Sequence, residues 1–247
     1  MSGQNATSSP KSAISSDWHS NCQGGEVAEI LLCLQRIVPP NTAVVAAAVA
    51  DATADLYPQE LRAIAKAVTK RRHEFATGRA LARLALAQLG YGRMPIPVGP
   101  QRRPMWPAGT IGSLSHCRGL CAAVVARTPQ TRALGLDLEW IRDVSEEIVF
   151  TITTATELAR NRNEIPETEL PGCLFSIREA VFKAYNPVTE SFLDFKDVEV
   201  ELDGRTNSFA ARLANGQRPS FLGSRIIGGR FAVVRGFAVC LVAAPTG

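Results

Sequence analysis

The sequence predicts an α+β fold built from two halves. Helical segments between residues 51 and 90 and between 148 and 185 alternate with groups of strand-like segments, and a turn at 128–132 separates the two groups. The chain has 247 residues, of which 46% are hydrophobic, so it has enough apolar side chains for one large or two small cores. We therefore expect a folded protein with a boundary near residue 130.

The first half begins after a polar leader, residues 1–24, which is rich in Ser and Asn. An apolar helix or strand over 26–38 ends at two prolines, and 42–50 has the apolar run of a buried strand. Residues 51–90 are mostly helical, with Pro58 as a first-turn signal, Gly90 as a stop and Gly78 as a possible break. A Pro- and Gly-rich loop follows over 91–109. Residues 112–115 have the composition of a small polar turn that leads into a strand ending near 127.

The second half opens with a strand at 133–140, followed by helices over 148–161 and 171–185. From residue 195 onward the sequence alternates as strands do, in DVEVEL, in SFAARL and in a final pair joined by a turn at Arg235 and Gly236. These elements complete the α+β pattern.

Composition excludes several classes of function. Lys and Arg number 27 against 23 Asp and Glu, and this mild excess does not fit a nucleic-acid-coating protein, although it suits an acidic substrate or partner. No apolar run approaches the roughly 20 residues of a membrane span. The six cysteines match neither a zinc site nor a disulfide scaffold, so we expect a reduced, cytoplasmic protein.

The strand ALGLDLEW carries the first candidate chemistry. Its side chains alternate, so the leucines and Trp140 share one face while Gly135, Asp137 and Glu139 share the other. Two neighbouring carboxylates repel each other unless a cation lies between them, and oxygen ligands favour Mg²⁺ or Mn²⁺. The alternative is a strand with a solvated acidic face.

A second candidate lies in the segment FSIREAVFK. Glu179 and Lys183 are four residues apart and stack on one face of a helix whose other side is apolar. Phe175 and Phe182 flank this face and would shield the two charges from water. The alternative is a surface salt bridge.

Basic residues form a third group. Arg72 and Arg79 lie two helical turns apart, Arg102 and Arg103 lie in the loop, and His116 follows the polar turn at 112–115. A small polar turn exposes backbone N–H groups, and together with arginines it is typical of a phosphate site. Solvated arginines and a loop histidine bonded to backbone are the alternatives.

Six segments occur in an order that resembles a known family: KRRHEFATGRALAR, PVGPQRRPMWP, GSLSHCRGLCAAVVA, GLDLEW, FSIREAVFKAYNP and FLDFKDVEVEL. Over about residues 42–243 the chain is similar to the 4′-phosphopantetheinyl transferases, in particular the larger class of the enterobactin synthase component D type. The resemblance implies two similar α/β halves related by a pseudo-twofold axis, with the active site between them. It also implies transfer of the phosphopantetheine arm of coenzyme A to a carrier-protein serine, with release of adenosine 3′,5′-bisphosphate.

The resemblance also implies roles for single residues. It makes Asp137, Glu139 and Glu179 the Mg²⁺ ligands, with Lys183 beside the pyrophosphate and Glu179 or a water as the base. The implied pocket for the 3′-phosphate and adenine consists of Arg72, Arg79, Ser115 and His116, and Arg178 is expected to reach a phosphate. The loop reads Gln101-Arg102-Arg103 where many relatives carry a lysine, which leaves open the arginine that replaces it.

The resemblance also implies a separate role for each half. Residues 25–130 are expected to contact coenzyme A, and residues 131–247 to supply the metal and catalytic motifs. The expected partners are acidic, helical carrier proteins of siderophore, nonribosomal peptide or polyketide synthesis, with apolar positions in 148–158 as docking candidates and ordinary helix core as the alternative. We expect a monomer that binds no nucleic acid. The competing functions are a Mg²⁺-dependent nucleotide phosphohydrolase and a non-catalytic module that binds coenzyme A or a carrier.

Overall fold

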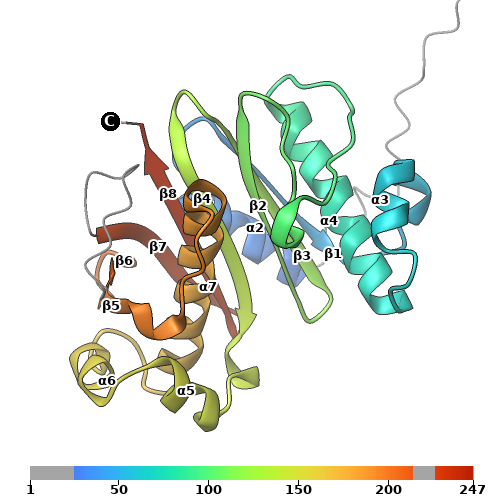
Figure 1. Ribbon diagram of the computed structural model, residues 1–247. Helices are drawn as coiled ribbons and strands as arrows, with labels where there is room; N and C mark the ends of the chain where they lie inside the picture. Colours follow the sequence, from blue (N-terminus) through green and yellow to red (C-terminus); the bar gives the residue numbers. More distant parts are fainter. Residues whose placement is uncertain (1–24, 214–225, 247) are drawn as a thin grey trace, which may run out of the picture.

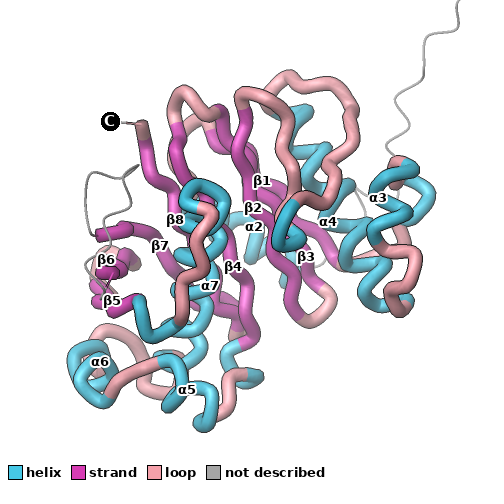
Figure 2. Tube along the Cα trace, viewed as in Figure 1, coloured by secondary structure: helices cyan, strands magenta, loops and turns pink. Residues whose placement is uncertain are grey.

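Two antiparallel sheets lie side by side in the computed structural model, which describes residues 25–213 and 226–246 (Figures 1 and 2). The leader predicted over 1–24 lies outside these residues. The first sheet has the strand order β1-β3-β2, from β1 (Thr42–Ala48), β2 (Thr110–Cys117) and β3 (Leu120–Arg127). The second has the order β4-β8-β7-β6-β5, with the following strand bounds: β4 Thr131–Trp140, β5 Val198–Asp203, β6 Ser208–Leu213, β7 Ile226–Val234 and β8 Phe237–Pro245.

Each sheet has one long helix on one face. Helix α4 (Thr69–Gln88) packs on β1 and β3, and α7 (Leu170–Thr189) packs on β4 and β8. Both helices bury small and aliphatic side chains against the alternate residues of the strands that face them. The segments with clear helical periodicity therefore form the two long helices that cover the sheets, as predicted.

The opposite faces of the two sheets share a third core beneath helix α2 (Gly25–Ile37). Val44 and Ala46 of β1 point into this core, whereas Ala43, Val45 and Ala47 point toward α4. The leucines of β4 at 134, 136 and 138 enter the same core from the second sheet. Because this core crosses residue 130, the two halves are packed as one body, and the predicted boundary there stays a prediction.

The two halves repeat one arrangement. In the first, β1 is followed by α4 and the hairpin β2–β3, with β3 in the middle of the sheet; in the second, β8 lies between β4 and β7 in the same way. Each long helix also carries an arginine ion-paired to a buried glutamate of the short helix before it. The pairs are Arg83 with Glu60 on α3 (Pro58–Ala63) and Arg178 with Glu157 on α6 (Ala155–Asn161). This repeat agrees with the implied two-half fold.

Several local predictions require correction. Gly78 does not break α4, which continues through it from Thr69 to Gln88, and a Cβ there would lie in ordinary contact with Cys121 Sγ at 3.7 Å. Residues 112–115 are not a turn but part of β2, paired with β3; the turn follows at Arg118 and Gly119, both with positive φ. The helix expected over 148–161 is divided into α5 (Glu146–Ile152) and α6, because Thr153 is extended and Thr154 caps α6.

Candidate active site

A cleft of about 610 Å³ opens where the two halves meet. Its walls come from α4, the loop 91–109 and β2 on one side and from β4 and α7 on the other. In Figure 1, β2 and β4 stand next to each other between α7 and α4. This volume lies within the range of about 300–1,000 Å³ that is typical of small-molecule sites.

The strands β2 and β4 are joined below the cleft by side chains, not by a backbone ladder. Alternate residues of β2 accept hydrogen bonds from alternate backbone N–H groups of β4. The pairs are Ser113 with Leu136 at 2.9 Å, Ser115 with Leu138 at 3.1 Å and Cys117 with Trp140 at 3.2 Å. This serine–cysteine seam satisfies the free edge of β4 and fixes its register against the first half.

Asp137 lies at the centre of the seam and lines the cleft. The residue is 4% exposed, and its carboxylate receives three hydrogen bonds. Lys183 Nζ donates to Oδ1 at 2.6 Å, Ser115 Oγ donates to Oδ1 at 3.0 Å, and Ser176 Oγ donates to Oδ2 at 2.8 Å. The alternation predicted for β4 is therefore confirmed, because the leucines are buried and the acidic face borders the cleft.

Glu139 and Glu179 line the same cleft from β4 and α7. Burial, followed by the charge of Asp137, raises the pKa of Glu139. Burial also raises the pKa of Glu179; Lys183 partly offsets this, while Asp137 and Glu139 add to it. The three carboxylates thus repel one another through the cleft. Among the described residues their oxygens do not all lie within 4.8 Å of one another.

A different group does bring its ligand atoms within 4.8 Å of one another: Cys117, Glu139 and Asp143. Burial raises the pKa of Cys117 to about 12, and its thiol donates to Glu139 Oε1 at 3.5 Å. Arg118 holds both oxygens of Asp143, at 2.6 and 2.9 Å. A protonated thiol and a paired carboxylate are poor ligands for a divalent cation, so this group does not form a metal site.

On the basic wall of the cleft, Arg79 is 4% exposed. Its Nε donates to Ile96 O at 2.7 Å, its guanidinium lies 4.3 Å from the centre of the Phe75 ring, and burial lowers its pKa to about 10. Arg72, by contrast, does not line the cleft; its neighbour Arg71 does. The two positions differ by about 100° of helix rotation, and a phosphate contact of Arg72 stays a prediction.

His116 lines the cleft beside Arg71, whose Nη1 lies 2.6 Å from His116 Nε2. Burial lowers the pKa of His116; Glu74 opposes this shift and Arg71 adds to it. The lowered pKa favours the neutral imidazole, whose Nε2 accepts from Arg71. Ser115, the other residue expected near the phosphate, directs its hydroxyl to Asp137. Arg71 was not among the residues predicted for the site, although its spacing of four and seven residues from Phe75 and Gly78 places the three on one helix face.

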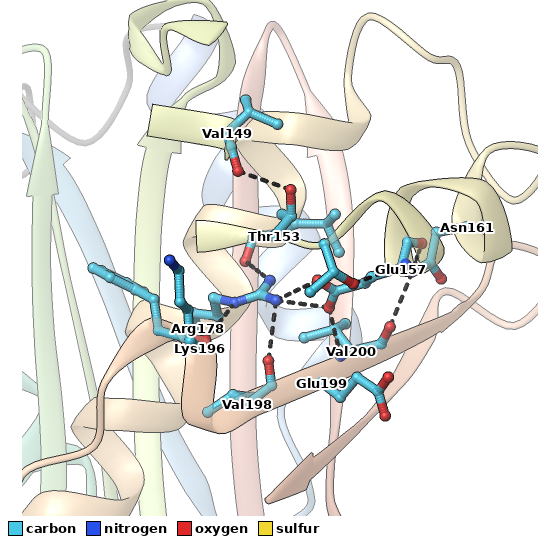
Figure 3. A network of polar contacts seen from close by, with 12 residues as sticks. Val149, Thr153, Glu157, Asn161, Arg178, Lys196, Val198, Glu199 and Val200 are labelled. Atoms are coloured by element: carbon cyan, nitrogen blue, oxygen red, sulfur yellow. Dashed lines mark hydrogen bonds and ion pairs between the residues drawn. The ribbon is translucent and has the colours of Figure 1, made fainter. Parts of the chain in front are cut away.

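Arg178 does not reach the cleft, which corrects its expected phosphate contact. The side chain is 2% exposed and lies on the far side of α7 in an ion pair of 2.6 Å with Glu157 (Figure 3). It also donates to Phe195 O and Val198 O, and Glu157 accepts from the backbone N–H of Val200. Arg178 therefore fastens α7 to α6 and β5.

The loop 91–109 contributes Gln101, Arg102 and Arg103 to the cleft wall. Arg103 donates to Pro187 O at 3.3 Å and Glu190 Oε1 at 3.1 Å, which ties the loop to the end of α7. Gln101 and Arg102 have φ values of 53° and 63°, in the left-handed region. Arg102 has no ion pair among the described residues and is the free loop cation at this wall.

The apolar positions predicted as docking candidates fall into two groups. Val149 and Ile152 are buried, and Leu158 packs against the core, as the helix-core alternative expects. Ile148 and Phe150 are 37% and 74% exposed and remain available. No helix in the described part of the chain has the length and apolar character to cross a membrane.

Comparisons with known proteins agree on one family. Residues 59–126 match the family described as the 4′-phosphopantetheinyl transferase N-terminal domain, and residues 133–239 match the 4′-phosphopantetheinyl transferase superfamily. The chain is 38% identical over 219 residues to the 4′-phosphopantetheinyl transferase Svp of Streptomyces mobaraensis, covering 84% of this chain and 89% of that protein. It is 35% identical over 196 residues to the transferase PptT of Mycobacterium tuberculosis, covering 75% and 84%.

More distant similarities extend the comparison. Enterobactin synthase component D of Escherichia coli K12 is 37% identical over 139 residues, covering 51% of this chain and 61% of that protein. Among solved structures, holo-[acyl-carrier-protein] synthase of Thermotoga maritima matches with a TM-score of 0.36 and 22% identity, covering 46% of this chain and 62% of that one.

Proposed function

The chain belongs to the 4′-phosphopantetheinyl transferase superfamily, and from this we propose that it moves the phosphopantetheine arm of coenzyme A onto a carrier-protein serine. The serine oxygen attacks the phosphorus next to the pantetheine. The bond from this phosphorus to the bridging oxygen breaks, and adenosine 3′,5′-bisphosphate leaves. The observation that carries the proposal is the cleft between the halves, with carboxylates on one wall and arginines on the other.

The basic wall suits the anionic part of coenzyme A. Arg71, Arg79, His116 and Arg102 come from α4, β2 and the loop and line one side of the cleft. Guanidinium groups bind phosphate by two parallel hydrogen bonds, and neutral His116 can donate one more. We assign the 3′-phosphate and adenine to this wall, with Arg102 as the loop arginine that stands where many relatives carry a lysine.

The carboxylate wall suits a divalent cation. Asp137, Glu139 and Glu179 offer only oxygen atoms, the ligands that Mg²⁺ and Mn²⁺ prefer. Burial and then the neighbouring carboxylates raise the pKa values of Glu139 and Glu179, and a bound cation would relieve the repulsion among the three groups. When bound, Mg²⁺ would neutralise charge on the pyrophosphate.

Two side chains of α7 are suited to accept the proton of the carrier serine and to offset the charge on the leaving phosphate. Glu179 makes no side-chain hydrogen bond or ion pair among the described residues, and burial raises its pKa. A carboxylate in this state can accept the proton of the carrier serine, directly or through a water. Lys183 lies one turn further along the helix, where its ammonium offsets the charge that develops on the leaving phosphate.

The exposed side chains of α5 suit a carrier protein. Ile148 and Phe150 present apolar surface, and the net charge of +4 favours an acidic partner. The relatives include a component of enterobactin synthase. We therefore propose siderophore, nonribosomal peptide or polyketide carriers as substrates for a cytoplasmic, monomeric enzyme.

One assay separates this proposal from its alternatives. The protein is incubated with coenzyme A, Mg²⁺ and an apo carrier protein, and the carrier is then weighed. A gain of one phosphopantetheinyl group supports the transferase. Release of adenosine 3′,5′-bisphosphate without gain on the carrier would indicate a phosphohydrolase, and tight binding of coenzyme A without either product would indicate a binding module.

A further inference from the structure

Two buried serines hold the carboxylate of Asp137 from opposite halves of the molecule. Ser115 lies on β2 and is 4% exposed, and Ser176 lies on α7 and is fully buried. No step of the proposed transfer uses either hydroxyl. The two serines lie on separate elements, yet both donate to the same carboxylate. This arrangement indicates a role beyond packing.

Ser176 interrupts an apolar helix face. Its neighbours Cys173, Ile177 and Ala180 are fully buried in the core against the second sheet. A buried hydroxyl destabilises a core unless it is hydrogen-bonded. The Ser176 hydroxyl donates to Asp137 Oδ2 at 2.8 Å across 39 residues of sequence, so the polar group is directed at the carboxylate.

Ser115 connects the same carboxylate to the seam between the halves. Its Oγ donates to Asp137 Oδ1 at 3.0 Å and accepts from the backbone N–H of Leu138 at 3.1 Å. The acceptor bond fixes the serine oxygen, and the donor bond then fixes the carboxylate. With Ser176 on the other oxygen, both oxygens of Asp137 are held in one orientation.

We propose that Ser115 and Ser176 are positioning residues that orient the Asp137 carboxylate toward the cleft before a divalent cation and coenzyme A bind. This inference rests on the proposed function and adds that the two serines hold a carboxylate that binds the metal. Hydrogen bonds to a metal-ligating carboxylate reduce the reorganisation that binding requires, and losing one costs about 10–100-fold in metal affinity or activity.

Ser113 provides a matched control. It lies on the same strand, is 5% exposed, and accepts from the backbone N–H of Leu136 at 2.9 Å, as Ser115 does from Leu138. It donates no hydrogen bond to a carboxylate in the described structure. Ser113→Ala therefore removes one seam bond, whereas Ser115→Ala removes a seam bond, the bond to Asp137 and the 3.3 Å bond that Ser115 accepts from Lys183 Nζ.

The test is calorimetric titration of Mg²⁺ into the protein saturated with coenzyme A, with thermal unfolding as a parallel measurement. Ser115→Ala and Ser176→Ala are expected to weaken Mg²⁺ binding by about tenfold. Ser113→Ala should bind Mg²⁺ as the unmodified protein does, while its melting temperature falls through the loss of its seam bond. The two serines lie on different elements, so either variant tests the proposal if the other does not fold.

Unchanged Mg²⁺ affinity in the folded serine variants would overturn the positioning role. Equal weakening in Ser113→Ala would also overturn it, because the effect would then come from the seam. Asp137→Asn separates this failure from that of the proposed function: if Asp137→Asn itself bound Mg²⁺ normally, the metal assignment would be wrong, whatever the serines do.

Discussion

Lys183 on α7 donates a 2.6 Å hydrogen bond to Oδ1 of Asp137 on β4, 46 residues away in the sequence. This ion pair lies in the cleft, and the ammonium of Lys183 also acts on the carboxylate of Glu179. The ammonium thus holds the position that a divalent cation would share. The stability of the folded protein therefore depends on which cation, the Lys183 ammonium or a divalent ion, lies against Asp137.

We expect Lys183→Met to leave the carboxylates without this cation. In the absence of Mg²⁺ the variant should melt at a lower temperature than the unmodified protein, and Mg²⁺ should raise its melting temperature by more. Transfer should slow by about 10²–10³-fold, because the charge on the leaving phosphate loses its partner. Calorimetric melting with and without Mg²⁺, together with kcat, checks both parts; an unaltered response to Mg²⁺ would contradict the shared position.

Glu179→Gln should stabilise the metal-free protein while it abolishes transfer. Because the folded state raises the pKa of Glu179 above its usual 4.5, ionisation of this group opposes folding at any pH above that value. Glutamine cannot ionise, so the variant should melt at a higher temperature at pH 7 without Mg²⁺, and the difference should vanish as the pH falls below 4.5. Melting curves across this pH range show whether the melting temperature of the variant is higher or lower than that of the unmodified protein. A lower melting temperature at pH 7 would show that Glu179 is not a repelled carboxylate.

The strand alternation was sufficient to predict the acidic wall, since a period of two fixes the face of Asp137 and Glu139 once Leu136 and Leu138 are assigned to the core. Helix faces were harder to assign. Adjacent residues differ by about 100°, so Arg72 was chosen where Arg71 lines the cleft, and Arg178 was assigned to a phosphate although it pairs with Glu157.

Contacts between distant residues left no local signal. Glu157 and Arg178 are 21 residues apart, and Ser176 and Asp137 are 39 apart; each pair forms only when α7 docks on the second sheet. The small residues at 112–115 were interpreted as a turn because Gly and Ser are frequent in turns. Here Gly112 instead allows the Trp106 ring to lie against β2, since a Cβ would come within 2.6 Å of the ring.

Arg71→Ala and Arg72→Ala form a matched pair for the basic wall. The two residues are adjacent on α4, but only Arg71 lines the cleft and contacts His116. Arg71→Ala should raise KM for coenzyme A by about tenfold, the effect of losing roughly 1.4 kcal/mol of charge-assisted hydrogen bonding. Arg72→Ala should leave KM unchanged. Steady-state kinetics with 3′-dephospho-coenzyme A locates the contact: a smaller effect of Arg71→Ala on this substrate places Arg71 at the 3′-phosphate. The reverse ranking of the two variants would restore the original assignment of Arg72.

Phe150→Asp tests the docking surface. The ring is 74% exposed on α5, so an acidic side chain there should repel an acidic carrier and raise KM for the carrier while KM for coenzyme A stays constant. Val68, also 74% exposed, is the N-cap residue before α4 in the first half, and Val68→Asp serves as the control for added negative charge. Kinetics with each substrate varied in turn separate the two constants. Equal effects of the two variants would remove Phe150 from the docking surface.

The most direct measurement is the anomalous scattering of Mn²⁺ in crystals grown with coenzyme A. We expect one strong peak bounded by oxygens of Asp137, Glu139 and Glu179, next to the pyrophosphate. No peak at this position, or a peak at the group of Cys117, Glu139 and Asp143 instead, would contradict it.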